Sequence, residues 1–101
     1  MLIFYKTSQS PEVKASSARD ISGGGICFDA AEPLLRGDVL QLVITKVIDD
    51  AGTAITMPIQ AKVIWARELG KDKYRVGLQF NEIDESHRAM IIENVEQKLK
   101  K

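Results

Sequence analysis

Apolar and polar residues alternate along most of the chain, which is the pattern of β-strands that bury one face. The alternation is strongest between Ile55 and Trp65 and between Tyr74 and Phe80. Near the N-terminus, aromatic and β-branched residues replace strict alternation and also favour a strand. The predicted strands cover residues 2–7, 13–19, 26–29, 39–48, 55–66 and 74–81.

Turn-forming residues separate these segments. Ser8 to Pro11, Asp49 to Gly52 and Gly70 to Lys73 each place Gly, Pro, Asp or Ser between two predicted strands. Pro58 falls inside a predicted strand, where it has no N–H to donate to a neighbour. We therefore expect Pro58 to lie at an edge position or at a bulge.

The hydrophobic period changes near the C-terminus. Apolar residues recur there at helical spacing, at Ile91, Ile92, Val95 and Leu99. Asp84 precedes them as a plausible N-cap, so the helix is expected to begin there and to pack against the sheet or barrel mouth. About six strands and one helix in 101 residues predict a single domain, a six-stranded antiparallel β-barrel plus a C-terminal α-helix.

Composition narrows the classes of partner. Lys plus Arg equals Asp plus Glu at 14 each, so net charge favours neither a nucleic-acid polymer nor a membrane surface. The six aromatic residues are scattered rather than gathered on one face, unlike barrels that bind single strands. No apolar run approaches the about 20 residues of a membrane span. A single cysteine, Cys27, excludes an internal disulfide and favours a cytoplasmic setting.

Catalytic chemistry has little support in the sequence. The only histidine, His87, falls in the predicted first helical turn without a nucleophile motif nearby, and is expected to be solvated. Asp49 and Asp50 form a carboxylate pair, but they lie in a predicted turn. The phosphate-binding patterns GxxxxGK[ST] and GxGxxG are absent. The protein is therefore expected not to be an enzyme and to hold no cofactor or metal.

Three consecutive glycines, Gly23 to Gly25, come after Asp20 and Ser22. Glycine reaches positive φ without steric cost and lets another backbone or a ligand come close. Asp and Ser before such a run can hydrogen-bond nearby backbone groups and fix a turn. The stretch predicts either a structural corner of the barrel or the floor of a binding site.

The pattern Asp20-x-Ser22-x-x-Gly25 resembles the DxSxxG signature of PilZ domains, which are bacterial receptors for cyclic di-GMP. The resemblance extends through Val63-Ile64-Trp65 and Val76-Gly77-Leu78-Gln79-Phe80 to the helical segment, and so covers almost the whole chain. It implies a six-stranded barrel with a C-terminal helix. It also implies a module that binds cyclic di-GMP and relays this second messenger to a protein effector or fused domain in motility, pili or polysaccharide export.

The resemblance implies roles for individual residues. Asp20 would accept hydrogen bonds from a guanine edge or a neighbouring arginine, because a carboxylate matches the N1–H and N2–H₂ donors of guanine. Ser22 would contact the base or a phosphate, and Gly25 would leave room for the ligand against the barrel wall. Arg19 would reach a phosphate.

Trp65 has two interpretations. It shares its predicted face with Val63 and Ile59, which indicates a core tryptophan. In some PilZ domains an aromatic residue near this place stacks on a guanine, and a bulge at Pro58 would alter the phase of the strand before Trp65. The sequence leaves both interpretations open.

The chain departs from the family at a second signature, RxxxR, whose arginines clamp the phosphates. No two of its arginines are four residues apart, the five being Arg19, Arg36, Arg67, Arg75 and Arg88. Lys6 and Lys14 do not replace them, because an ammonium group lacks the bidentate fork of a guanidinium. Two explanations fit: an RxxxR segment precedes Met1, or the chain is a PilZ-fold protein-interaction domain that does not bind the nucleotide.

Overall fold

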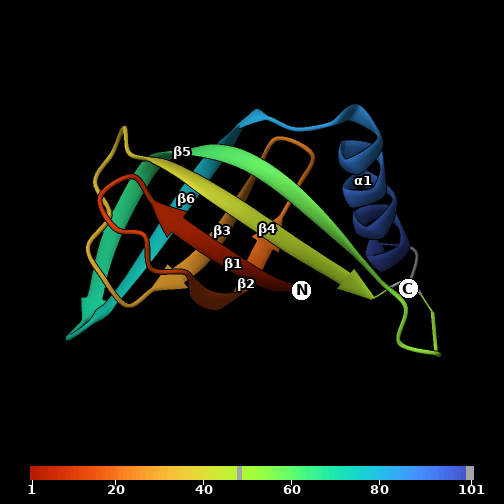
Figure 1. Cartoon of the computed structure of the whole chain (residues 1–101), viewed down its shortest axis with the longest axis horizontal. Helices are drawn as coiled ribbons and strands as arrows, with labels where there is room; N and C mark the ends of the chain where they lie inside the picture. The colour runs from red at the N-terminus through yellow and green to blue at the C-terminus, as the bar shows by residue number, and fades with distance from the viewer. Residues whose placement is uncertain (48, 100–101) are drawn as a thin grey trace.

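The six predicted strands form a closed antiparallel barrel with the helix at one end (Figure 1). The computed structural model describes residues 1–47 and 49–99, with side chains described up to Ile92. Within this part of the chain the elements are β1 (Leu2–Thr7), β2 (Lys14–Ile21), β3 (Gly25–Ala30), β4 (Val39–Val47), β5 (Ala54–Gly70), β6 (Lys73–Glu82) and α1 (Glu85–Leu99). The strands close in the order β1-β2-β3-β6-β5-β4, which confirms the predicted fold class.

Alternation along each strand determines which side chains fill the barrel. In β3, Ile26 and Phe28 are buried, while Cys27 and Asp29 face outward, as their positions predict. The rings of Tyr5 and Phe28 meet inside with their centroids 5.0 Å apart. The buried apolar residues are Ile3, Tyr5, Ile26, Phe28, Ala30, Leu34, Leu40, Leu42, Ile44, Met57, Ile59, Ala61, Val63, Val76, Leu78, Phe80 and Ile91.

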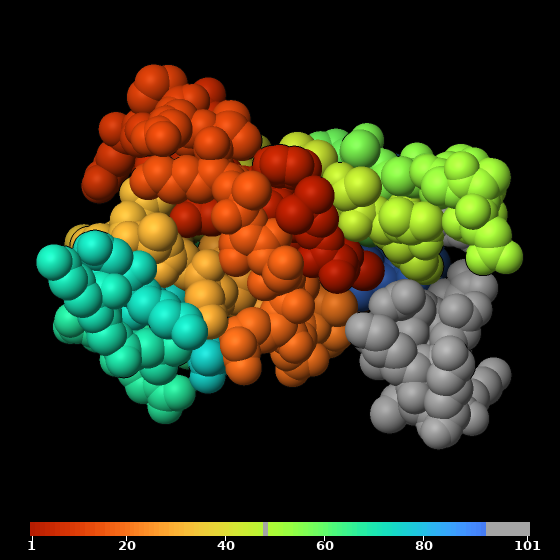
Figure 2. Space-filling model, turned by 90° about the horizontal axis from the view of Figure 1, so that it is seen from below, coloured from red at the N-terminus to blue at the C-terminus, as the bar shows by residue number. Residues whose placement is uncertain are grey.

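Strand β5 is 17 residues long and changes partner along its length. Residues 54–62 pair with β4, whereas pairing with β6 begins at Gln60 and ends at Gly70. Pro58 lies before the β5–β6 ladder starts, which agrees with its expected edge position. Because β5 extends beyond both partners, its two hairpins project at opposite ends of the molecule (Figures 1 and 2).

The partner change produces a bulge that turns Trp65 outward. The register of β5 against β6 shifts between Val63 and Trp65. Val63 itself exchanges two backbone hydrogen bonds of 2.8 Å with the loop before β4, donating to Asp38 O and accepting from Gly37 N. A bulge places an extra residue in one strand and reverses the faces of the residues after it. Trp65 is consequently 42% exposed, so its interpretation as a core tryptophan is wrong.

Helix α1 closes the end of the barrel nearest the β4–β5 hairpin (Figure 1). Asp84 caps it as predicted, since its Oδ1 accepts a hydrogen bond of 2.8 Å from the Ser86 amide. Ile91 is fully buried in the barrel core, and Lys46 Nζ donates to the carbonyl of Met90 at 3.3 Å. The predicted positions of Ile48 and of the Val95 and Leu99 side chains lie outside the described residues.

Candidate functional site

The turn between β2 and β3 carries the DxSxxG residues and is held by Ser22. The Ser22 amide donates to the Gly25 carbonyl at 2.9 Å, and the Gly24 amide donates to Ser22 Oγ at 3.3 Å. The Phe80 amide donates to the carbonyl of Gly24 at 3.0 Å, which attaches the turn to β6. Ser22 therefore fixes the turn, as its residue type predicts, and its hydroxyl lies beside the outer surface of β3.

Close approach, rather than positive φ, accounts for two of the three glycines. None of Gly23, Gly24 and Gly25 has a positive φ. A Cβ on Gly25 would lie 2.3 Å from the carbonyl oxygen of Leu78, and one on Gly23 would lie 2.9 Å from Cγ1 of Ile92 in α1. The absence of a side chain at Gly25 therefore allows β3 to pack closely against β6, while a Cβ on Gly24 would meet nothing within 4 Å.

A bulge in β2 presents Arg19 and Asp20 together on the outer surface. Ala18 pairs with Phe28 and Asp20 pairs with Cys27, so Arg19 is the extra residue, and both Arg19 and Asp20 are exposed. Nη1 of Arg19 lies 3.5 Å from Oδ2 of Asp29. The Asp20 carboxylate makes no hydrogen bond or ion pair to the described residues, and so remains available to a ligand.

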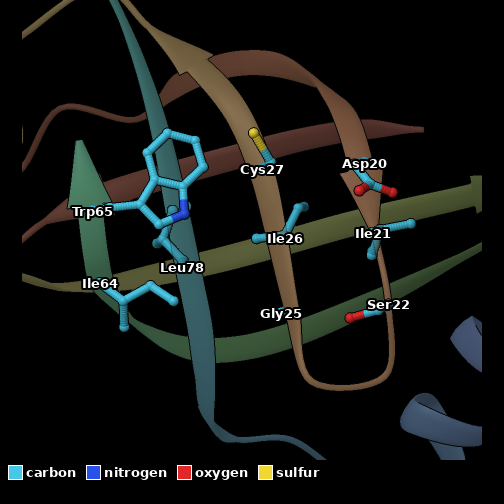
Figure 3. A pocket seen from close by; sticks show the side chains of 10 residues that line it. Asp20, Ile21, Ser22, Gly25, Ile26, Cys27, Ile64, Trp65 and Leu78 are labelled. Carbon is cyan, nitrogen blue, oxygen red and sulfur yellow. The ribbon is translucent and has the colours of Figure 1, made fainter. Parts of the chain in front are cut away.

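The indole of Trp65 lies across β6 at Gly77, its partner in the β5–β6 ladder (Figure 3). A Cβ on Gly77 would lie 2.1 Å from Nε1 and 2.3 Å from Cε2 of Trp65. Only glycine leaves room for the ring at this position. Gly77 is therefore a positioning residue for Trp65.

These features surround a shallow pocket of about 220 Å³ on the outer surface of the barrel (Figure 3). Its lining residues are Asp20, Ile21, Ser22, Gly25, Ile26, Cys27, Ile64, Trp65, Gly77 and Leu78. The structure thus brings together four of the five predicted site residues, whereas Arg19 lies beside the pocket rather than in its lining. The volume is below the about 300–1,000 Å³ of pockets for drug-sized ligands, so it suits one planar base.

Six lining residues were not among the predicted site residues, namely Ile21, Ile26, Cys27, Ile64, Gly77 and Leu78. Cys27 and Gly77 lie on the outward phase of their strands, so alternation alone would have placed them beside the site. Ile64 is 43% exposed and also follows the outward phase of its strand, next to the buried Val63. No sequence signal marks the bulge that turns Trp65 outward.

Charges near the pocket are set by Asp29 and its cations. Burial raises the pKa of the Cys27 thiol, so Cys27 is a neutral surface at the pocket floor near pH 7. The hydrogen bond from Arg75 Nε to Asp29 Oδ1, 3.0 Å long, lowers the pKa of Asp29. The charges of Arg19 and Lys73 lower it further.

We expect the Asp29–Arg75 pair to stabilise the folded protein near neutral pH and to lose this stabilisation in acid. A carboxylate with a lowered folded-state pKa binds its proton more readily when unfolded, so its stabilisation is complete above the ordinary Asp pKa of about 3.9. It is lost as the pH falls through the lower pKa of the folded state. Urea unfolding between pH 6 and pH 2 should show a smaller acid loss for Asp29→Asn than for the unsubstituted chain. Equal acid losses in the two proteins would contradict this role.

Other candidate chemistry is sparse in residues 1–47 and 49–99. No group of three His, Cys, Asp or Glu side chains lies close enough there to hold a metal ion. His87 is partly buried rather than solvated as expected, and its Nδ1 has no hydrogen-bond partner among the described residues. None of the described helical residues forms a helix long and apolar enough to cross a membrane.

Comparison with known proteins agrees with the geometry. The family model for the PilZ domain matches residues 2–97. The solved structure of the Bacillus subtilis inhibitor of motility (MotI/DgrA) is similar, with a TM-score of 0.80 and 19% sequence identity. The match covers 100% of this chain and 49% of that one, so this chain spans about half its length. No curated protein matches the sequence.

The family match is to a binding and adaptor module, and no catalytic family is indicated. The match extends over both the glycine turn and the Trp65–Gly77 pair, which lie at opposite sides of the pocket. With its closed six-stranded barrel and C-terminal helix, the chain belongs to the PilZ domain family.

Proposed function

We propose that this domain binds cyclic di-GMP at the pocket between Asp20 and Trp65 and passes the signal to a protein partner in the cytoplasm. The observation that carries the proposal is the free Asp20 carboxylate, which shares a pocket with an exposed indole. A carboxylate left exposed and unpaired is suited to accept hydrogen bonds from a ligand. Family membership supplies the class of ligand, because PilZ domains generally are receptors for cyclic di-GMP.

Guanine matches the pocket in both shape and polarity. Its N1–H and N2–H₂ groups would donate to Asp20, while its plane would overlap the indole of Trp65. Stacking of a base on an aromatic side chain contributes about 1–3 kcal/mol, and a charge-assisted hydrogen bond contributes about 1.5–3 kcal/mol. The neutral Cys27 lies between them on β3, where it would form an apolar floor for the base.

Helix α1 would transmit the binding signal from the pocket to the protein partner. Gly23 of the β2–β3 turn lies against Ile92, so a ligand that shifts this turn would also change the packing of the helix. The partner would be a protein effector or fused domain acting in motility, pili or polysaccharide export. Among these, the similar Bacillus subtilis structure is described as an inhibitor of motility, which favours a motility output.

Replacing Asp20 with asparagine should weaken cyclic di-GMP binding at least about tenfold, because one or two charge-assisted hydrogen bonds are lost. Calorimetric titration measures the affinity. Quenching of Trp65, the only tryptophan, reports independently on stacking. Asp50→Asn is the matched control, since Asp50 is exposed in the turn of the distant β4–β5 hairpin. Unchanged binding in Asp20→Asn would remove Asp20 from the site.

The missing RxxxR pattern favours a second candidate, a PilZ-fold protein-interaction domain without a nucleotide. Lys14, one cation that precedes the turn, is already paired with Glu32. Absence of heat at high-micromolar cyclic di-GMP, together with unchanged Trp65 fluorescence, would contradict the receptor proposal and favour this alternative.

A further inference from the structure

A row of cations lies on the outer surface one pleat away from the pocket. It is made by Arg67 of β5, Arg75 of β6 and Arg19 of β2, with Asp29 of β3 among them. Lys73 Nζ lies 3.9 Å from Asp29 Oδ2. We call these five residues the cation row. Each of its strands also contributes to the pocket. In β5, β6 and β3 the row residues lie two positions from the pocket residues Trp65, Gly77 and Cys27.

The cation row holds more positive charge than its carboxylate balances. Asp29 is the only carboxylate within ion-pairing distance of Arg19, Lys73 and Arg75 among the described residues. Arg67 is exposed and makes no ion pair with the described residues. The cation row therefore contains four cations and one anion, and three of the cations lie within ion-pairing distance of that anion.

Arg67 and Arg75 bring two like charges opposite each other on the outer surface. They are direct partners in the β5–β6 ladder, and both follow the outward phase of Trp65 and Gly77. Opposed residues on one face of a sheet have Cβ atoms about 4.5–5.5 Å apart, and like charges there destabilise the sheet. An anion bound between the two guanidinium groups would relieve this repulsion.

We propose that Arg67 and Arg75 bind a phosphodiester group of the nucleotide whose base occupies the pocket. The inference rests on the proposed function, and it assigns to strands β5 and β6 a phosphate contact made without an RxxxR pattern. Arg19, expected to reach a phosphate, would approach the same group from β2.

The spacing of the two surfaces agrees with this assignment. Residues two apart in a strand are separated by about 6.6–6.8 Å, which is comparable to the distance between base and phosphate within one nucleotide. The pocket holds one base, so the sugar and phosphates of the ligand must lie on the neighbouring surface. Guanidinium groups suit that surface, because their planar fork binds phosphate oxygens in pairs.

The test compares cyclic di-GMP affinity in Arg67→Gln and in Arg67→Gln/Arg75→Gln, using the full chain and fluorescence of Trp65. We expect a loss of about threefold to tenfold in the single variant and about tenfold to hundredfold or more in the double variant. Raising KCl from about 50 to about 500 mM should weaken binding to the unsubstituted chain, and this dependence should flatten in the double variant.

Lys6→Gln is the matched control, because Lys6 is an exposed cation on β1, three strands from β6 in either direction around the barrel. Arg67→Gln breaks no ion pair of the described residues, so its fold should survive, and circular dichroism checks this. If the unsubstituted chain binds while both arginine variants bind equally well, the inference is overturned and the proposed function stands. An equal loss in Lys6→Gln would also overturn it. If the unsubstituted chain does not bind cyclic di-GMP, the proposed function is wrong, and so is this inference, which rests on it.

Discussion

Substituting alanine for Gly25 should lower the free energy of unfolding by about 1–3 kcal/mol, the usual cost of forcing an extra carbon into packed structure. The Cβ would lie 2.3 Å from the Leu78 carbonyl oxygen, which is backbone and cannot rotate away. Strands β3 and β6 would have to separate where the β2–β3 turn ends. Thermal unfolding monitored by circular dichroism measures the loss, at about 4–8 °C for each kcal/mol in a domain of this size.

The neighbouring glycine is the control for this prediction. A Cβ on Gly24 meets nothing within 4 Å, and Gly24 has no positive φ. Gly24→Ala should therefore leave stability unchanged or raise it by up to about 1 kcal/mol, because alanine restricts the unfolded chain. Equal destabilisation by the two substitutions would show that Gly25 does not act through its contact with β6.

Truncating Phe28 to alanine should cost about 3–5 kcal/mol, which is the range for buried aromatic residues. Phe28 is fully buried and contacts Tyr5 across the barrel core. Since the free energy of unfolding of small domains is only about 5–15 kcal/mol, the variant should retain only a small part of it. Urea unfolding at room temperature provides the measurement.

Cys27→Ala, one residue away, tests the alternation of β3 directly. Cys27 faces the pocket and not the core, so its truncation should cost under about 1 kcal/mol. A loss comparable to that of Phe28→Ala would mean that the two residues do not point to opposite faces of the barrel wall.

Binding and stability predictions are separable because they involve opposite faces of the same strands. Asp20, Trp65 and Arg67 are exposed, so their substitutions should alter ligand affinity with little change in unfolding. Phe28 affects the fold first. Gly25 contributes to both, since it lines the pocket and holds β3 against β6.

Local patterns were sufficient to predict the elements of this protein. Period-two alternation identifies the buried faces of β3, β4 and β6, because the face of a residue in a strand depends only on its position within that strand. Helical spacing and the Asp84 cap locate α1 in the same way. The DxSxxG pattern identified the β2–β3 turn and three of the residues that line the pocket.

Trp65 and Gly25 show what local sequence patterns do not predict. Trp65 faces outward because β5 changes from β4 to β6 near Val63, and that change depends on residues far away in the chain. Gly25 lines the pocket, but its closest constraint is the carbonyl of Leu78 on another strand, which no local pattern reveals. The cation row likewise exists only because barrel closure places β2, β3, β6 and β5 side by side.

The sequence by itself determined the strands, the inward faces of β3, β4 and β6, the helix and the family, since each depends on residue order over a few positions. Tertiary structure decided the composition of the site. Two bulges, at Arg19 and before Trp65, turned side chains outward, and pairing between distant strands assembled them around one pocket. Bulges and strand pairing depend on partners remote in sequence, and so a local pattern does not encode them.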